Sequence, residues 1–273
     1  MRARASDATM EHLVQDVFPG FSGFEYPPVI SHERGISRRD PSPVVRLGET
    51  FYVWYSKSTQ DPSGYAASVW YAASPDGRAW REIGEALPKG STGAWDEHGV
   101  FTPTVFIWDS TYYLVYTGVP EPFTNDDGGP EGTTTAIGIA AAASPDGPWR
   151  RVGTAPILVP ADDTDRFDSH RVDDACVVRR EGKFWLYYKG RQAGKTPGQT
   201  KMGLARSDLP TGPYARYSAG PVVGSGHEVC AWPHGKGVAA IMAPVGPDGS
   251  SLQYSSDGLS FATVANINPP KAP

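Results

Sequence analysis

Three acidic side chains occupy one equivalent slot in a motif that recurs four times along the chain. The four slot residues are Asp40, Thr102, Asp174 and Glu228. Paired carboxylic acids can hydrolyse a glycosidic bond with inversion, because one activates a water molecule and the other protonates the leaving oxygen. Their carboxyl groups must then lie about 6.5–9.5 Å apart. The slots predict a carboxylate-lined, sugar-cleaving pocket if the fold brings them together.

Each repeat predicts a four-stranded antiparallel unit. Its first half reads as a β-hairpin with an aromatic-rich second strand, as in DPSPVVRLGETFYVWYS from Asp40 and DACVVRREGKFWLYYKG from Asp174. Its second half is a strand followed by a turn and an aromatic residue, as in WYAASPDGRAW. Such units pack radially into a β-propeller whose innermost strands surround a tunnel. Because each slot residue begins a first strand, we expect all four at one end of that tunnel.

The bulk composition indicates one all-β domain. The chain has 273 residues, 31 glycines and 26 prolines, which suits many tight turns. We expect residues 38–273 to form the propeller, with four recognisable blades, and residues 1–37 to help close the ring. The net charge of −5 and the lack of a basic stripe argue against a nucleic-acid partner and favour an uncharged substrate. No apolar run of about 18 residues and no signal peptide is visible, so we expect no membrane partner and, by default, a cytoplasmic protein, or a periplasmic one if the sequence is part of a longer chain.

Two of the acids have contexts that suggest roles. Asp40 follows Arg38 and Arg39 in SRRDPSP, and a nearby guanidinium favours the ionised carboxylate that a general base needs. The alternative is an aspartate that caps a turn before proline. Asp173 and Asp174 are adjacent, so strand alternation should point one into the tunnel and the other away, unless both are simply solvated. Asp174, and not Asp173, aligns with Asp40 in the repeat, so we expect Asp174 to point into the tunnel.

The segment GSGHEVCAW places a histidine beside the fourth slot. Its two glycines allow the backbone to approach a ligand closely. A neighbouring carboxylate should raise the pKa of His227 and make it a proton donor to a leaving oxygen. Glu228 could be the acid instead, if burial raises its pKa. A surface histidine without a catalytic role is the remaining alternative.

Further side chains are candidates for sugar binding, because aromatic faces stack on sugar rings and cations or hydroxyls bond sugar oxygens. These candidates are Arg39, Trp95, His98, Thr102, Lys189 and Arg191. Other aromatics recur at the same places in each repeat and are expected to pack between blades. They are Tyr52, Trp54, Trp80, Tyr113, Trp149, Trp185, Tyr187, Tyr214 and Phe261.

The sequence predicts no cofactor, disulfide or metal site. Cys176 and Cys230 each lie two residues beyond a slot and should be small buried residues on neighbouring blades. No zinc-ligand spacing or phosphate-binding loop is present. A divalent cation on the axis stays open, because acidic and histidine side chains converge there.

In their order, the segments RRDPSPVV, YVWYSKS, WDEHGVFTPTV, SHRVDDACVV, FWLYYKGR and SGHEVCAW resemble glycoside hydrolase family 117, over about residues 38–273. The resemblance implies a five-bladed β-propeller related to families 43 and 32. It also implies an exo-acting, inverting α-1,3-neoagarooligosaccharide hydrolase, which releases 3,6-anhydro-L-galactose from the non-reducing end of neoagaro-oligosaccharides such as neoagarobiose, and hence a role in agar degradation. Carried over by motif, Asp40 is the general base, Asp174 supports the transition state, His227 is the acid and Glu228 is its companion.

The sequence departs from the family pattern at both ends. Residues 6–11 lack the arginine of a Ser-x-Ala-x-x-Arg pattern that supports a swapped dimer, so a homodimer is left open. The chain stops after the fourth repeat, so we expect an incomplete fifth blade. Two alternatives to the agar-specific enzyme remain: a hydrolase or phosphorylase of the same fold acting on arabinan, mannan or a galactoside, and a propeller that binds sugars without cleaving them.

Overall fold

The structure is a computed structural model that describes residues 30–59, 61, 63–124, 132–217 and 220–267. Most of the N-terminal segment 1–37, which was expected to help close the ring, lies outside these residues. The described residues include no helix that is long and apolar enough to cross a membrane.

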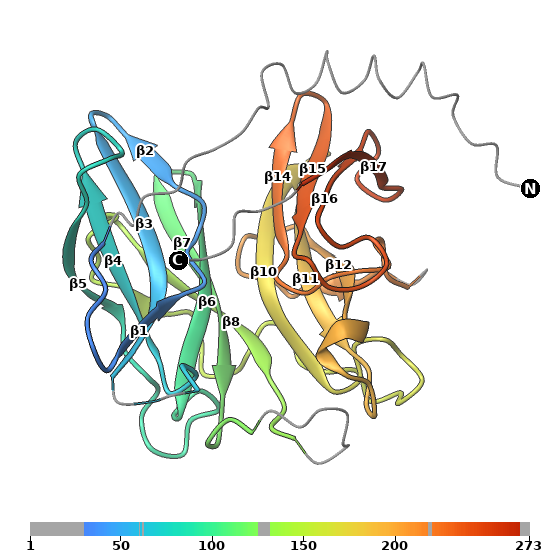
Figure 1. The fold of residues 1–273 in the computed structure, drawn as a ribbon, viewed down its shortest axis with the longest axis horizontal. Coiled ribbons are helices and arrows are strands. Elements are labelled where there is room, and N and C mark those ends of the chain that lie inside the picture. Colours follow the sequence, from blue (N-terminus) through green and yellow to red (C-terminus); the bar gives the residue numbers. More distant parts are fainter. Residues whose placement is uncertain (1–29, 60, 62, 125–131, 218–219, 268–273) are drawn as a thin grey trace, which may run out of the picture.

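Four antiparallel sheets make up the described part of the chain, one for each repeat (Figure 1). Blade 1 contains β1 (Ile36–Arg39), β2 (Val45–Leu47), β3 (Thr50–Thr59), β4 (Ser68–Ser74) and β5 (Arg81–Leu87). Blade 2 contains β6 (Gly99–Trp108), β7 (Thr111–Val119), β8 (Ala136–Ala142) and β9 (Arg150–Arg151). Blade 3 contains β10 (Arg171–Arg180), β11 (Lys183–Arg191), the short 3₁₀ helix η1 (Pro197–Gln199), β12 (Lys201–Ser207) and β13 (Ala215–Arg216). Blade 4 contains β14 (Cys230–His234), β15 (Gly237–Met242), β16 (Ser251–Ser255) and β17 (Ala262–Asn266).

Blades 2 to 4 are meanders in which each strand pairs with the next along the chain, as predicted. In blade 1 the innermost strand is interrupted, and β1 and β2 both pair with β3. The interruption contains Pro41 and Pro43, which have no N–H to donate to a sheet ladder. Ser42 between them still bonds its N–H to the carbonyl of Trp54 on β3, at 2.7 Å. The described residues thus form an all-β propeller of four blades, and a fifth blade is not among them.

The hydrophobic core consists of layers between consecutive blades. One buried cluster joins blades 1 and 2, a second joins blades 2 and 3, and a third joins blades 3 and 4. The recurring aromatics account for much of these layers, as expected: Trp54, Trp185 and Tyr187 are fully buried. Trp149 packs edge-on against Trp54 of the preceding blade, and Phe261 packs in the same way against Tyr187.

Trp80 is an exception to this packing. It lies where Trp149 and Phe261 lie in their blades, but blade 1 has no preceding blade among the described residues. Trp80 lines an apolar groove of about 490 Å³ together with Val44, Val53 and Tyr55. In Figure 1 blade 1, in blue to teal, and blade 4, in orange to red, are the first and the last blades along the chain.

The two cysteines lie on the innermost strands of neighbouring blades, and both are free thiols. Cys176 is buried in the layer between blades 3 and 4, and its Sγ lies 3.4 Å from the carbonyl oxygen of Val229. Cys230 is half-buried. Both cysteines were predicted to be buried between blades, and Cys176 is buried there whereas Cys230 is only partly so.

Candidate active site at the propeller axis

The four slot residues share an uncommon backbone conformation. Asp40, Thr102, Asp174 and Glu228 have φ of 52°, 47°, 47° and 59°. This left-handed region is unfavourable for residues with a Cβ, and such strain persists where the surrounding structure enforces it. On β6 and β10 the slot coincides with a shift of strand register in which one extra residue is inserted, as in a β-bulge.

The structure therefore corrects the prediction that the slot residues begin their strands. Thr102 and Asp174 lie inside β6 and β10, Asp40 lies in the gap between β1 and β2, and Glu228 precedes β14 by two residues. The convergence holds nevertheless, because a bulge bends the strand and redirects the side chain that it carries.

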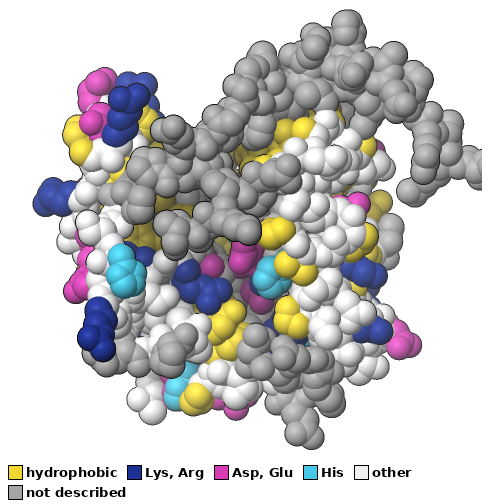
Figure 2. All heavy atoms as spheres, viewed as in Figure 1, with side chains coloured by type: hydrophobic (Ala, Val, Ile, Leu, Met, Phe, Trp, Pro, Cys, Tyr) yellow, Lys and Arg dark blue, Asp and Glu magenta, His cyan; other side chains and the backbone are white. Residues whose placement is uncertain are grey.

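The four slot residues line two neighbouring cavities on the propeller axis, and we call the level at which they meet the waist. One hollow, of about 200 Å³, we call the polar hollow. It is lined by Arg39, Asp40, Tyr65, Phe101, Thr102, Phe123, Arg171, Asp173, Asp174, Lys189, Arg191, Pro197, Thr200, His227 and Glu228. Figure 2 shows basic, acidic and histidine side chains gathered near the centre of one face of the molecule. The other hollow, of about 390 Å³, shares the four slot residues and is otherwise lined mainly by Pro41, Pro103, Val229, Cys230, Ile241 and Ala243.

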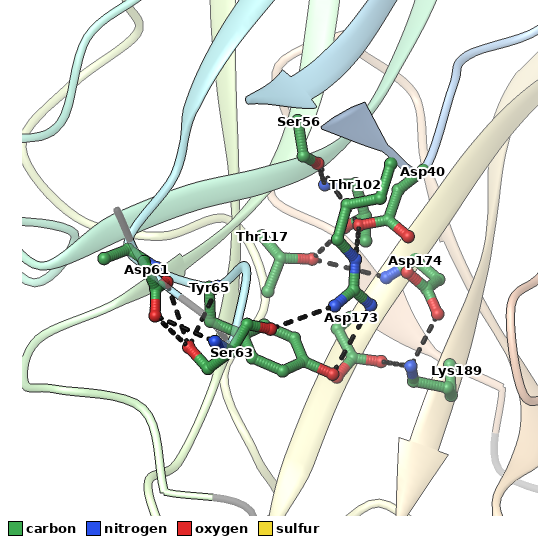
Figure 3. A network of polar contacts seen from close by, with 12 residues as sticks. Asp40, Ser56, Asp61, Ser63, Tyr65, Thr102, Thr117, Asp173, Asp174 and Lys189 are labelled. Atoms are coloured by element: carbon green, nitrogen blue, oxygen red, sulfur yellow. Dashed lines mark hydrogen bonds and ion pairs between the residues drawn. The ribbon is translucent and has the colours of Figure 1, made fainter. Parts of the chain in front are cut away.

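Asp40 is held by side chains of blade 1. Nε of Arg39 lies 2.9 Å from its Oδ2, and the hydroxyl of Ser56 lies 3.3 Å from the same oxygen (Figure 3). Burial raises the pKa of Asp40, the adjacent arginine opposes this, and the nearby Asp174 adds to it. The expectation that the arginine controls this carboxylate is therefore corrected, because desolvation outweighs it. A raised pKa makes Asp40 a stronger base.

Asp173 and Asp174 both line the polar hollow, and both contact Lys189. Nζ of Lys189 lies 3.0 Å from Oδ1 of Asp173 and 2.6 Å from Oδ2 of Asp174. The prediction that only one aspartate points inward is wrong, because the bulge at this place breaks the strand alternation on which it depended. Burial raises the pKa of Asp173 to about 6, against the opposing effect of Lys189.

Lys189 was expected to bind sugar, but its ammonium group is already engaged. Its side chain is only 15% exposed and is placed between the two carboxylates. Burial lowers the pKa of Lys189, but the two carboxylates outweigh burial and raise it, so the group stays charged. Its positive charge offsets one of the two adjacent negative charges.

His227 and Glu228 both line the polar hollow, but the pKa of His227 is opposite to the expectation. Burial lowers it, and Lys189 lowers it further, while Asp174 and Glu228 oppose them without compensating. The imidazole is therefore neutral at neutral pH. Glu228 is exposed, and within the described ranges no hydrogen bond or ion pair holds its carboxylate.

Arg39, Thr102 and Arg191 line the polar hollow as predicted for sugar-binding residues, but Trp95 and His98 do not. The segment that carries these two is tied to blade 2 by Asp96. The buried carboxylate of Asp96 accepts hydrogen bonds from Tyr116 (2.9 Å) and Arg151 (2.7 Å). As a result Trp95 stacks on Tyr116, with ring centroids 5.7 Å apart. His98 instead lies 3.0 Å from Glu97.

The packing of Trp95 can be tested at Gly138 on β8. A Cβ at this position would lie 2.5 Å from Cζ of Tyr116 and 2.8 Å from the Trp95 ring. We expect Gly138→Ala to lower the free energy of unfolding by about 1–3 kcal/mol, because the rings must move. In the matched control Gly84→Ala, the new Cβ meets nothing within 4 Å. Urea unfolding of both variants measures the difference, and equal stabilities would contradict the packing described here.

Several residues that line the polar hollow do not belong to the repeated sequence pattern, so the pattern could not identify them. Tyr65 and Phe123 lie on connections between strands, and their rings stack with centroids 3.8 Å apart. The guanidinium of Arg39 covers Tyr65 at 4.5 Å, and that of Arg171 covers Phe123 at 4.5 Å. Both faces of each ring are thus occupied, and the stack holds the two arginines in place rather than offering an aromatic face to a sugar.

No group of three or more His, Cys, Asp and Glu side chains is gathered for metal binding in the part of the chain that the structure describes. The absence of a cofactor requirement stays a prediction.

Comparisons with known proteins agree with this fold and site. Zg3597, a family 117 glycoside hydrolase from the marine bacterium Zobellia galactanivorans, is similar with a TM-score of 0.76 and 27% identity, over 91% of this chain and 74% of that chain. A family 32 β-fructofuranosidase from Bombyx mori (TM-score 0.59, 14% identity, 83% of this chain and 48% of that one) shares the fold. So does a protein described with the family 130 mannoside phosphorylases (TM-score 0.61, 15% identity, 90% and 81%).

The similarity to Zg3597 confirms the resemblance to family 117, and the likeness to family 32 is one of fold. No curated protein sequence matches the chain. The model of glycosyl hydrolases family 43 matches residues 34–192, which is more than half of the chain. The protein thus belongs to glycosyl hydrolases family 43 and is a glycoside hydrolase that resembles family 117.

Proposed function

We propose that the protein is an exo-acting, inverting glycoside hydrolase whose catalytic groups lie at the waist. The observation that carries this proposal is the meeting of Asp40, Asp174 and Glu228, from three different blades, around one polar hollow. Asp40 is the general base that deprotonates water, and its raised pKa suits this role. Asp174, which is paired with Lys189, stabilises the positive charge that develops on the sugar ring in the transition state.

We assign the proton donor to Glu228 rather than to His227. Burial lowers the pKa of His227 and so disfavours imidazolium, whereas the Glu228 carboxyl faces the hollow and is not held by another side chain. The burial of Glu228 on which the sequence argument for this role depended is not found in the free protein, where the side chain is exposed, so in this proposal it is the bound sugar that covers it. The neighbouring imidazole can then accept or donate a hydrogen bond to the substrate.

This assignment predicts different behaviour for two variants. Glu228→Gln should lower kcat by about 10²-fold or more on a natural oligosaccharide, because the leaving oxygen departs without a proton. It should lose much less activity on an aryl glycoside with an acidic phenol, which needs no protonation. His227→Gln should affect both substrates alike. The assignment is overturned if His227→Gln, and not Glu228→Gln, shows the leaving-group dependence.

The substrate that we propose is a neoagaro-oligosaccharide, from which the enzyme releases 3,6-anhydro-L-galactose by cleaving an α-1,3 bond. Support comes from the similarity to a family 117 enzyme and from the charge of the polar hollow. Four cationic and four acidic side chains line it, so their formal charges cancel in the free protein, before Glu228 takes up the proton that it donates. This balance suits an uncharged sugar.

Hydrolysis is favoured over phosphorolysis, because the cations of the hollow have partners. Lys189 is paired with two aspartates and Arg39 with Asp40. Arg171 donates to the carbonyls of Thr133 and Thr124, both at 2.8 Å. A phosphate would have to displace these contacts.

Incubation with a panel of oligosaccharides tests the proposal. The panel contains neoagarobiose, arabino-oligosaccharides, manno-oligosaccharides and galactosides, each with and without inorganic phosphate, and products are separated by chromatography. We expect cleavage of neoagarobiose to free monosaccharides at a rate independent of phosphate. Cleavage of another member alone would replace the proposed sugar, sugar phosphates would indicate a phosphorylase, and binding without any product would indicate a non-catalytic propeller.

A further inference from the structure

Two buried hydroxyls occupy equivalent positions near the ends of the second strands of blades 1 and 2. Ser56 on β3 is 0% exposed and Thr117 on β7 is 1% exposed. Each follows a tyrosine in the repeated segments YVWYS and YLVYT. Neither hydroxyl lines the polar hollow, so neither can contact a substrate there.

Each hydroxyl contacts two slots at once, one in its own blade and one in the next. The Ser56 hydroxyl donates to Oδ2 of Asp40 in its own blade (3.3 Å) and accepts the N–H of Thr102 in blade 2 (2.9 Å). The Thr117 hydroxyl lies 2.6 Å from the Thr102 hydroxyl in its own blade and accepts the N–H of Asp174 in blade 3 (3.3 Å). Figure 3 shows these contacts as one continuous network that extends from Asp40 to Asp174 and Lys189.

The accepted N–H groups belong to residues in the left-handed conformation. Thr102 and Asp174 lie at the register shifts of β6 and β10, where a bulge leaves backbone groups without a partner in the ladder. A buried N–H without a partner is costly. The hydroxyl of the preceding blade supplies that partner, and the same hydroxyl also hydrogen-bonds the slot side chain of its own blade.

We propose that Ser56 and Thr117 are positioning residues of the active site, which lock the slots of consecutive blades into one rigid unit and aim Asp40 and Asp174. Their role in catalysis rests on the proposed function. Through them the geometry of the base on blade 1 is linked to that of the second aspartate on blade 3, although no strand connects the two residues directly.

Blades 3 and 4 have no hydroxyl at the position of Ser56 and Thr117, which explains why the network does not extend to Glu228. Lys189 occupies the equivalent position in blade 3, and an ammonium group can donate to Asp174 but cannot accept the N–H of Glu228. Ala243 occupies it in blade 4 and has no polar atom. The network therefore fixes Asp40 and Asp174 and leaves Glu228 able to adjust as it transfers a proton.

The kinetic test compares variants that remove a hydroxyl with variants that keep it. We expect Ser56→Ala and Thr117→Val to lower kcat by about tenfold or more with little change in KM, because the loss is one of alignment. Thr117→Ser, which retains the hydroxyl, should stay close to wild type. Ser58→Ala is the matched control, since Ser58 is also buried on β3 but its hydroxyl has no hydrogen-bond partner within the described residues. Thermal melting of each variant checks that the fold persists.

A second readout does not depend on turnover. The ¹³C resonance of the Asp40 carboxyl, assigned by its loss in Asp40→Asn, reports its titration in the free protein. Ser56→Ala removes a donor to the carboxylate and should raise its pKa, whereas Ser58→Ala should not. The other charged or titratable groups that face Asp40 are Arg39, Asp174, Lys189, His227 and Glu228, and both variants leave them in place.

The two readouts separate this proposal from the proposed function. If the wild-type protein cleaves no oligosaccharide, the proposed function fails, while the titration of Asp40 still decides whether Ser56 holds it. The positioning role is overturned if the pKa of Asp40 is the same in Ser56→Ala and wild type. It is also overturned if Thr117→Val and Thr117→Ser are equally active.

Discussion

Replacing Asp40 by asparagine is expected to lower kcat by about 10³-fold or more while leaving the fold intact. The amide has the shape of the carboxylate and can still contact Arg39 and Ser56, but it cannot accept a proton from water. Asparagine also tolerates the left-handed backbone at this position. Because the base acts in its ionised form, wild-type turnover should fall as pH decreases through the raised pKa of Asp40.

The matched control for this variant is Asp109→Asn. Asp109 is an exposed aspartate with the same left-handed backbone, φ 48°, but it lies in a turn far along its strand from the waist. Rates of sugar release by both variants, with melting curves to verify folding, form the measurement. Near wild-type turnover in Asp40→Asn would eliminate the assignment of the base.

Replacing Lys189 by methionine is expected to lower the free energy of unfolding by about 3–5 kcal/mol at pH 7.5. The substitution leaves Asp173 and Asp174 side by side without the ammonium group that lies within 3.0 Å of both. Two neighbouring buried anions are unfavourable through desolvation and mutual repulsion. Turnover should fall as well, since Asp174 loses the ammonium group that holds its carboxylate at 2.6 Å.

The effect of Lys189→Met should depend on pH in a defined direction. Without the lysine, the pKa of Asp173, which burial already raises, should rise further above its unfolded value, so the folded state binds a proton that the unfolded state releases. The variant therefore gains stability as pH falls, and its deficit relative to wild type should be smaller at pH 5 than at pH 8. Urea unfolding at both pH values measures this.

Lys183→Met serves as the control, because Lys183 begins the same strand and pairs with Asp208 at the surface. Exposed ion pairs contribute about 0–1 kcal/mol, so this variant should be nearly as stable as wild type at both pH values. A deficit for Lys189→Met that is no larger than that of Lys183→Met would contradict the account of the buried cluster.

The sequence allowed the propeller and the convergence of the slot residues to be predicted because both follow from a repeated pattern. Four strand-rich units, three of them with an acid in the equivalent slot, favour radial packing, and the structure brings Asp40, Asp174 and Glu228 to one waist. Local geometry could not be predicted in the same way. Strand alternation assigned Asp173 an outward position, but one inserted residue on β10 reverses that assignment.

Side chains outside the repeat were predicted less well for a different reason. Trp95 and His98 precede a slot in sequence, but the buried ion pair between Asp96 and Arg151 fixes their segment against blade 2. Tyr65 and Phe123 reach the polar hollow from connections whose path depends on tertiary contacts. The direction of the His227 pKa depends on burial and on Lys189, which no local motif reveals.

The most direct test of a sugar-cleaving centre at the waist is a crystal structure of Asp40→Asn with an intact oligosaccharide that the wild-type protein cleaves. We expect the terminal sugar in the polar hollow, with its glycosidic oxygen within hydrogen-bond distance of Glu228 and its anomeric carbon facing residue 40 across a water molecule. An oligosaccharide bound elsewhere on the protein, with the waist empty, would contradict the account.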